Sequence, residues 1–163
     1  MANPPTGGAK IENHATSVAV GDGPGQNGYV LEEQIGHILR RVHQRASAIF
    51  SAEFAEFELT PTQFAALAKI GDGGEVSQNL IGRLTAMDPA TVQGVIGRLS
   101  KRGLITSKPD PGDRRRTLWR LTEQGADLLV RAIPSGIRTT EGTLAPLDAG
   151  EQAYLLDLLG RLS

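Results

Sequence analysis

The chain has 163 residues, and its 17 lysines and arginines against 18 aspartates and glutamates give a formal net charge of only −1. It contains no cysteine, which excludes disulfides, thiolate metal sites and oxidant sensing through a thiol. The histidines lack a second ligand at a metal-binding spacing, no apolar run reaches about 18 residues, and no secretory signal pattern is present. We therefore expect a cytoplasmic protein of one domain, with no metal, cofactor or membrane anchor.

Residues 1–28 are rich in glycine, proline and asparagine and show no hydrophobic period. This composition predicts a flexible N-terminal arm. A role in contacting DNA or in wrapping a second subunit stays open, although Lys10 is the only cation of the arm and so weighs against DNA.

A long helix is predicted from Val30 to Phe54, because apolar residues recur along one face at helical spacing. These residues are Ile35, Ile38, Leu39, Val42, Ala46 and Ile49. The period breaks between Glu53 and Leu59, which predicts a connecting segment there.

The next helix has a strong start signal, because Thr60 and Gln63 form a capping box around Pro61 at the first helical position. It is expected to end in the glycine-rich segment 71–74, which lacks the lysine and spacing of a phosphate-binding loop. Its expected inner face is Phe64, Leu67, Ala68 and Ile70.

A helix-turn-helix is predicted downstream. Ser77 is expected to cap a short helix through Leu84, with Leu80, Ile81 and Leu84 pointing inward. Residues 85–87 form the turn, and Asp88 with Pro89 opens a second helix. This arrangement is typical of proteins that place their second helix in the major groove of DNA.

The second helix is amphipathic and is expected to end at Gly103. Its buried stripe is Val92, Val95, Ile96 and Leu99. Its outward face carries small and hydrogen-bonding residues, namely Ala90, Thr91, Gln93, Gly94, Gly97, Arg98 and Lys101. Such a face fits close against a large polar surface.

Two extended runs, Leu104 to Lys108 and Thr117 to Leu121, predict a hairpin with a long tip containing Arg114, Arg115 and Arg116. Between Arg83 and Arg120 there are nine lysines and arginines against three aspartates, a net charge of +6, whereas the rest of the chain carries −7. A near-neutral protein thus concentrates positive charge on one helix and one hairpin, which is the electrostatic pattern of a nucleic-acid-binding protein.

Two helices are predicted after the hairpin. Thr122 caps the first, and Pro134 predicts a kink or break near Ile133 before the helix resumes toward Thr143. Asp148 and Glu151 form a capping box for the last helix, Ala149 to Arg161. Its broad apolar face is Tyr154, Leu155, Leu158, Leu159 and Leu162.

From about residue 30 to its end, the sequence resembles the MarR family of winged-helix transcriptional regulators. The hallmark of that family is a recognition helix ending in R-L-x-x-x-G-L, followed by D-x-R-R and L-T-x-x-G. The matching residues here are Arg98-Leu99 with Gly103-Leu104, Asp113-Arg114-Arg115-Arg116, and Leu121-Thr122-Glu123-Gln124-Gly125. The combination is specific, although each motif alone is weak.

The resemblance implies a mainly α fold with a small β-wing. Residues 60–121 would form the winged helix-turn-helix core, and residues 29–59 and 122–163 would supply flanking dimerisation helices. The terminal helices also carry more aliphatic surface than a small core can cover, which independently favours a homodimer. Such a dimer would present two recognition helices to a double-stranded, pseudo-palindromic operator with half-sites about one helical turn apart.

The expected DNA contacts divide into reading and positioning groups. On the recognition helix, Thr91 and Gln93 suit base reading, and Gly94 allows close backbone approach. Arg98 would bind a phosphate or pair with Asp113, and Lys101 adds positive charge at the same face. Ser77, Gln78 and Asn79 would donate hydrogen bonds to backbone phosphates.

In the wing, Arg115 stands where the resembled family inserts an arginine into the minor groove, and a planar cation is attracted to that narrow, negative groove. Asp113 is expected to orient a nearby arginine. Arg114 and Arg116 are phosphate candidates whose separate roles stay open.

Members of the resembled family generally bind small phenolic or aromatic anions between the dimer helices and the winged domain. On that basis Arg40, His43 and Phe64 are candidates for a cation, a hydrogen-bonding group and an aromatic wall. The pattern is most similar to repressors of aromatic-acid catabolism, which implies release from DNA by a small aromatic acid or its CoA thioester. Activation instead of repression, and efflux or stress genes with a different effector, stay open.

No nucleophile elbow, phosphate-binding loop, dinucleotide fingerprint or histidine–carboxylate cluster is present, so no enzyme and no catalytic residue is expected. A winged helix that binds protein instead of DNA is the remaining alternative. The basic hairpin tip disfavours it.

Overall fold

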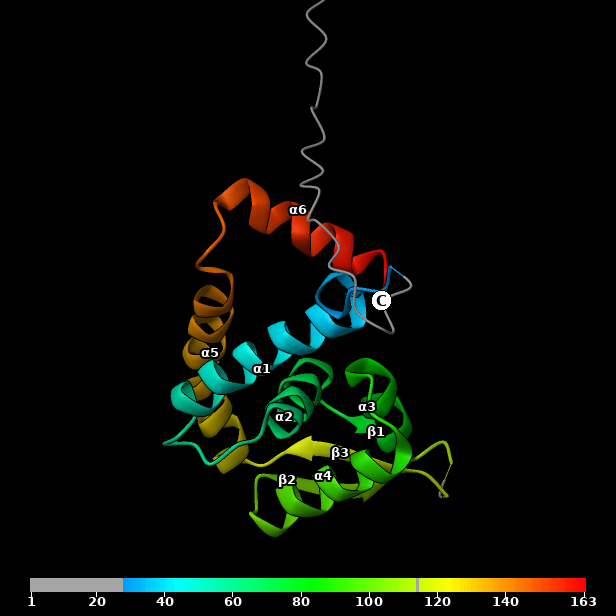
Figure 1. The fold of residues 1–163 in the computed structure, drawn as a ribbon. Helices are drawn as coiled ribbons and strands as arrows, with labels where there is room; N and C mark the ends of the chain where they lie inside the picture. The colour runs from blue at the N-terminus through cyan, green and yellow to red at the C-terminus, as the bar shows by residue number, and fades with distance from the viewer. Residues whose placement is uncertain (1–27, 114) are drawn as a thin grey trace, which may run out of the picture.

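The computed structural model describes residues 28–113 and 115–163, so the predicted N-terminal arm lies outside the described residues apart from Gly28. The elements are a 3-10 turn Leu31–Glu33, α1 Ile35–Glu53, α2 Pro61–Gly73, β1 Val76–Ser77, α3 Gln78–Thr85, α4 Pro89–Lys101, β2 Ile105–Pro109, β3 Thr117–Leu121, α5 Glu123–Leu144 and α6 Ala149–Gly160. Figure 1 shows α2, α3, α4 and the sheet gathered at one end, with α6 at the other and α1 and α5 between them. The predicted mainly α fold with a small wing is confirmed.

The helix starts follow the local capping signals. At α2 the capping box is complete, with Thr60 N–H donating to Gln63 Oε1 over 2.9 Å and Gln63 N–H donating to Thr60 Oγ1 over 3.3 Å. The other predicted N-caps, Ser77, Asp88, Thr122 and Asp148, each accept a backbone N–H through the side chain. These predictions succeed because a cap depends on three or four adjacent residues only.

The sheet has the strand order β1-β3-β2 and is antiparallel throughout. Trp119 of β3 pairs with Val76 of β1 on one side and with Ser107 of β2 on the other. The two-residue strand β1 was not predicted. It ties the start of α3 to the base of the hairpin and therefore positions the helix-turn-helix relative to the wing.

The predicted start of β2 at Leu104 is one residue early. Gly103 has a φ of +70°, and Leu104 N–H donates to Leu99 O over 3.1 Å, so both residues still belong to the closure of α4. Gly103 ends the helix as predicted because glycine adopts this left-handed conformation without strain.

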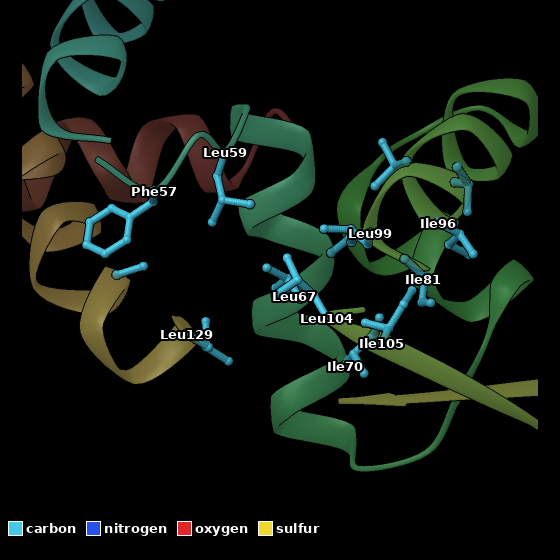
Figure 2. Packing of buried hydrophobic residues seen from close by; sticks show 14 of the residues in the cluster. Phe57, Leu59, Leu67, Ile70, Ile81, Ile96, Leu99, Leu104, Ile105 and Leu129 are labelled. Atoms are coloured by element: carbon cyan, nitrogen blue, oxygen red, sulfur yellow. The ribbon is translucent and has the colours of Figure 1, made fainter. Parts of the chain in front are cut away.

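The core lies between α2, α4 and the sheet. Figure 2 shows Leu67 and Ile70 of α2 directed toward Leu99, Leu104 and Ile105. All five are buried, as are the other members of the predicted α4 stripe, Val92, Val95 and Ile96. A second layer of aromatic rings joins α1 to α2, with Phe54 stacked on Phe50 at 3.8 Å and edge-on to Phe64 at 4.7 Å between ring centroids.

Three predictions are wrong in detail. Leu84 was expected inward but is 49% exposed, because α3 ends at Thr85 and its packed face is centred on Ile81 and Gly82. The long first helix begins at Ile35, after the separate 3-10 turn. Of the kink or break predicted near Ile133, the break does not occur, since α5 runs unbroken over 22 residues. α5 packs along α1, and Ala132 and Ser135 beside the proline are buried, so tertiary packing offsets the missing proline N–H.

Three helices leave apolar side chains in solvent. In α1 the exposed residues are Ile35, Ile38, Leu39 and Val42, and in α5 they are Val130, Ile133 and Ile137. The third helix, α6, has no buried residue at all. Tyr154 and Leu162 at the C-terminal end are 65% and 76% exposed. These surfaces match the apolar faces predicted for the flanking helices. Among the described residues, no helix combines the length and hydropathy that crossing a membrane requires.

Thr60→Ala is expected to lower the free energy of unfolding by about 1 kcal/mol, because it removes the side-chain acceptor at the start of α2. Urea denaturation at fixed protein concentration measures this change. Thr140→Ala is the matched control, since Thr140 is an exposed interior residue of α5 whose hydroxyl only returns to Gly136 O. An equal loss in both variants would contradict the capping explanation.

Candidate nucleic-acid interface

The turn between α3 and α4 is closed by backbone geometry. Ala86 adopts a left-handed conformation with φ 51°, and Met87 N–H donates to Gly82 O over 3.0 Å. A Cβ atom at the buried Gly82 would stand 3.1 Å from Val92 Cγ2. The two helices therefore pack closely, which fixes the outward face of α4.

The outward face of α4 is open to solvent. Gln93, Arg98 and Lys101 are exposed, whereas Thr91 and Gly94 are half-buried. The Arg98 guanidinium folds back along the helix, with its Nη2 3.5 Å from where a Cβ of Gly94 would lie. A Cβ at Gly94 would make only ordinary van der Waals contact with the guanidinium, which therefore lies over Gly94 on the outward face of α4.

The N-terminus of α4 carries a carboxylate. Asp88 Oδ1 accepts from Thr91 N–H over 2.9 Å, and Asp88 Oδ2 accepts from Thr91 Oγ1 over 2.5 Å. The hydrogen bond from the Thr91 hydroxyl, followed by that from the Thr91 N–H, lowers the pKa of Asp88 from its ordinary value. Asp88 is therefore ionised at neutral pH and also caps the helix.

The wing tip is organised around Asp113. Its Oδ1 accepts from Arg115 N–H over 3.0 Å and from Arg115 Nε over 3.2 Å, while the Arg115 side chain remains 93% exposed. Asp113 thus orients an arginine, as predicted, and the partner is Arg115. Among the described residues, no ion pair joins Asp113 to Arg98. Arg116 Nη1 lies 3.7 Å from Asp110 Oδ2. Arg114 lies outside the described residues.

The start of α3 and the base of the wing line one concave surface. A hollow of about 290 Å³ is lined by Ser77, Gln78, Asn79, Arg115, Arg116 and Thr117. A larger adjoining hollow of about 710 Å³ shares Ser77, Gln78, Asn79 and Arg116, and extends over Arg83 to Pro89 at the start of α4. We call these two hollows together the HTH–wing groove. Predicted contact residues from two separate segments, the start of α3 and the wing, therefore meet in one place. The predicted contact residues of α4 do not line these hollows; they are Thr91, Gln93, Gly94, Arg98 and Lys101.

Two adjustments to the predicted site follow from this geometry. Ser77 is buried and its hydroxyl accepts from Leu80 N–H, so it supports α3 from within. Arg83 lines the HTH–wing groove, although sequence reasoning counted it only toward the regional charge. Its position on the short helix, one turn after Asn79, was the signal that could have placed it there.

Two of the nine cations in the basic region have structural partners elsewhere. Arg102 donates to Phe57 O over 3.0 Å and to Glu58 O over 2.6 Å, and so anchors the end of α4 to the segment before α2. Lys108 pairs with Glu75 at 2.6 Å. Among the described residues, the positive charge facing outward therefore rests on fewer residues than the sequence count suggests, chiefly Arg83, Arg98, Lys101, Arg115 and Arg116.

The three candidate effector residues lie on two helices. Arg40 and His43 are exposed and one turn apart on α1, whereas Phe64 is half-buried on α2. The Phe64 ring packs on Phe54, near the opposite end of α1. Among the described residues no cluster of three or more histidine, aspartate, glutamate or cysteine side chains suits a metal ion.

Comparison with known proteins gives a consistent assignment. A model of the MarR family matches residues 57–116, which include α2, α3, α4 and most of the wing. The transcriptional repressor NicR of Pseudomonas putida is 41% identical over 134 residues, which are 82% of this chain and 85% of NicR.

Two solved structures have the same fold and related sequences. A probable transcriptional regulator from Pseudomonas aeruginosa is 46% identical with a TM-score of 0.79, and the match covers 82% of this chain and all of that one. BpsR of Bordetella bronchiseptica, whose DNA binding is regulated by 6-hydroxynicotinic acid, is 38% identical with a TM-score of 0.79 over 82% of this chain and 96% of its own. These relatives are transcriptional regulators and not enzymes. The chain therefore belongs to the MarR family of winged-helix transcriptional regulators.

Proposed function

We propose that the protein is a repressor that binds a pseudo-palindromic operator as a homodimer and leaves it when a small aromatic acid, or the CoA thioester of one, binds. The observation that carries this proposal is the HTH–wing groove, where Gln78 and Asn79 meet Arg115 and Arg116 beside the start of α4. A repressor function is supported by the similarity to NicR.

In this proposal each residue makes the DNA contact that its position in the fold allows. Thr91 and Gln93 read base edges in the major groove, with Arg98 and Lys101 adding charge at the same face. Gln78, Asn79 and Arg116 hold phosphates, and Arg115 enters the minor groove. Ser77 acts by fixing the start of α3, and Arg114 stays a phosphate candidate on its sequence position.

The homodimer is supported by the apolar residues that the flanking helices expose. Ile38, Leu39 and Val42 on α1, together with α6, form surfaces that a single chain leaves in water. Burying them against a second copy gains about 25 cal/mol for each Å² of apolar surface. Residues 29–59 and 122–163 would then form the dimer scaffold around two copies of the 60–121 core.

An aromatic acid as effector is supported by the similarity to BpsR, which responds to 6-hydroxynicotinic acid. Arg40 and His43, one turn apart on α1, are proposed to hold the carboxylate. Phe64 packs near the opposite end of α1 and stays a candidate for an aromatic contact on its sequence position. Neither Arg40 nor His43 takes part in the ion pairs found among the described residues, so both are available to an anion. Release would follow a shift toward a spacing of the two α4 helices that no longer fits the half-sites.

The proposal is tested by fluorescence-anisotropy titration of duplexes selected from a randomised pool. We expect sequence-specific binding, a dimer in sedimentation equilibrium, and weakening of about 5- to 150-fold by an aromatic acid. The panel contains benzoic, 4-hydroxybenzoic and 6-hydroxynicotinic acids and benzoyl-CoA, with cyclohexanecarboxylic acid as the non-aromatic control.

Variants distinguish the effector site from the DNA site. Arg40→Ala should reduce the response to the acid and leave DNA affinity unchanged, whereas Lys69→Ala, which removes an exposed cation of α2, should change neither. A monomer in solution, or retention of random and selected duplexes alike, would refute the proposed function.

A further inference from the structure

The contact between Asp88 and Thr91 goes beyond an ordinary helix cap. The cap itself is the 2.9 Å bond from Thr91 N–H to Asp88 Oδ1. The second carboxylate oxygen, Oδ2, contacts the hydroxyl of the same threonine at 2.5 Å. One carboxylate thus holds both the backbone and the side chain of a residue in the first turn of α4.

The direction of the second bond is set by chemistry. An ionised carboxylate accepts hydrogen bonds and cannot donate them, so the proton between the two oxygens belongs to the Thr91 hydroxyl. The lowered pKa of Asp88 keeps the carboxylate ionised at neutral pH. A threonine hydroxyl has a single proton, and here that proton is already used.

This leaves Thr91 with a restricted set of contacts. Toward a third partner its oxygen offers only lone pairs, and the bond to Asp88 also holds the rotamer, so the γ-methyl stays in one position. In the major groove, the N6 amine of adenine and the N4 amine of cytosine are donors, and thymine presents a methyl group. Guanine presents two acceptors, O6 and N7, which cannot bond to an oxygen without a free proton.

We propose that Asp88 is a specificity-determining positioning residue, which fixes the hydroxyl proton of Thr91 so that the base edge facing Thr91 is adenine, cytosine or thymine and not guanine. This rests on the proposed function, because it requires that the first turn of α4 reads the major groove. The first turn is where recognition helices contact base edges.

The test is selection of duplexes from a randomised half-site pool by the full-length protein and its variants, followed by sequencing. Asp88→Asn keeps a good N-cap, but its amide can donate to Thr91 Oγ1 and so frees the hydroxyl proton. Asp88→Ser is the second variant, since it also caps the helix and removes the carboxylate. Thr91→Val retains the shape and identifies the base position that Thr91 contacts.

We expect Asp88→Asn and Asp88→Ser to raise guanine relative to adenine by about fivefold or more at the position that Thr91→Val identifies, the lower range of one base contact. In the double variant Asp88→Asn/Thr91→Val this change should vanish, whereas a purely structural cap would alter affinity at all positions together. An unchanged base preference in both Asp88 variants, or a shift that persists without the Thr91 hydroxyl, would overturn the inference. If the wild-type protein enriched no sequence at all, the proposed function itself would fail. That result differs from the two outcomes that would overturn only the inference about Asp88.

Discussion

Replacing Arg115 with alanine is expected to weaken operator binding by about 1–3 kcal/mol, the largest effect of any single substitution in the wing. The Arg115 side chain is 93% exposed and contacts Asp113 within its own loop, so its removal leaves the core untouched. A guanidinium held at the tip of the hairpin is attracted to the narrow, negative minor groove, and alanine loses that attraction. Affinity is measured by anisotropy titration at several salt concentrations.

The salt dependence separates a direct contact from an indirect effect. Loss of one cation from the DNA surface should reduce the slope of log K against log salt by about 0.9. Arg131→Ala is the matched control, because Arg131 is an exposed arginine on α5 outside the HTH–wing groove. Equal affinities for the wild type and Arg115→Ala would remove Arg115 from the interface.

Substitution of Asp113 is expected to have a smaller effect on operator affinity than substitution of Arg115. Asp113→Asn retains an acceptor for Arg115 N–H and removes the charge that pairs with Arg115 Nε. The guanidinium then samples more orientations, so we expect an affinity between those of the wild type and Arg115→Ala. The salt slope should stay close to that of the wild type, because the cation itself is still present.

The features that could be predicted from the sequence are those with local causes. The N-caps Thr60, Asp88 and Thr122 each depend on a side chain and a backbone N–H three residues away. The α4 stripe is buried as predicted because helical spacing places its members on one face. The same holds for Gly103, whose left-handed conformation was implied by its place at the helix end.

The features that escaped prediction depend on distant partners. β1 has only two residues, and Val76 becomes a strand residue because Trp119, far along the chain, pairs with it. Pro134 stays within an unbroken helix because α1 packs along α5. Neither of these causes lies within a window of neighbouring residues.

The candidate site shows the same division. The sequence predicted that Asp113 orients a nearby arginine and left Arg98 as one possible partner, and the structure identifies the partner as Arg115, two residues away. The meeting of Gln78 and Asn79 with Arg116 required the pairing of β1 with β3, so the sequence predicted the members but not the groove. The hydrogen bond from the Thr91 hydroxyl to Asp88 Oδ2 could be recognised only once the Asp88 carboxylate was placed in three dimensions.

Replacing Gly125 with alanine is expected to have the largest effect on stability. A Cβ atom at Gly125 would overlap the carbonyl oxygen of Leu104 and lie 2.8 Å from its carbonyl carbon, and both are backbone atoms that cannot rotate away. The same oxygen accepts from Thr122 N–H over 3.1 Å, and Thr122 Oγ1 donates to Gly103 O over 2.7 Å. Gly125 therefore allows the start of α5 to lie against the end of α4.

We expect Gly125→Ala to lower the free energy of unfolding by about 3 kcal/mol or more, because overpacking and the loss of a buried backbone hydrogen bond act together. Thermal unfolding should show a decrease in Tm of roughly 6–12 °C for a chain of this size.

Gly97→Ala is the matched control, since nothing lies within 4 Å of a Cβ there and alanine favours an exposed helix position by about 1 kcal/mol. The two glycine variants should thus move stability in opposite directions. Operator affinity of Gly125→Ala should fall as well. A shift of α5 would move Gly103 and Leu104, which lie between the end of α4 and the first strand of the wing. A Gly125→Ala protein as stable as the wild type would show that α5 can shift away from Leu104 at little cost, and that the L-T-x-x-G glycine is not required for packing.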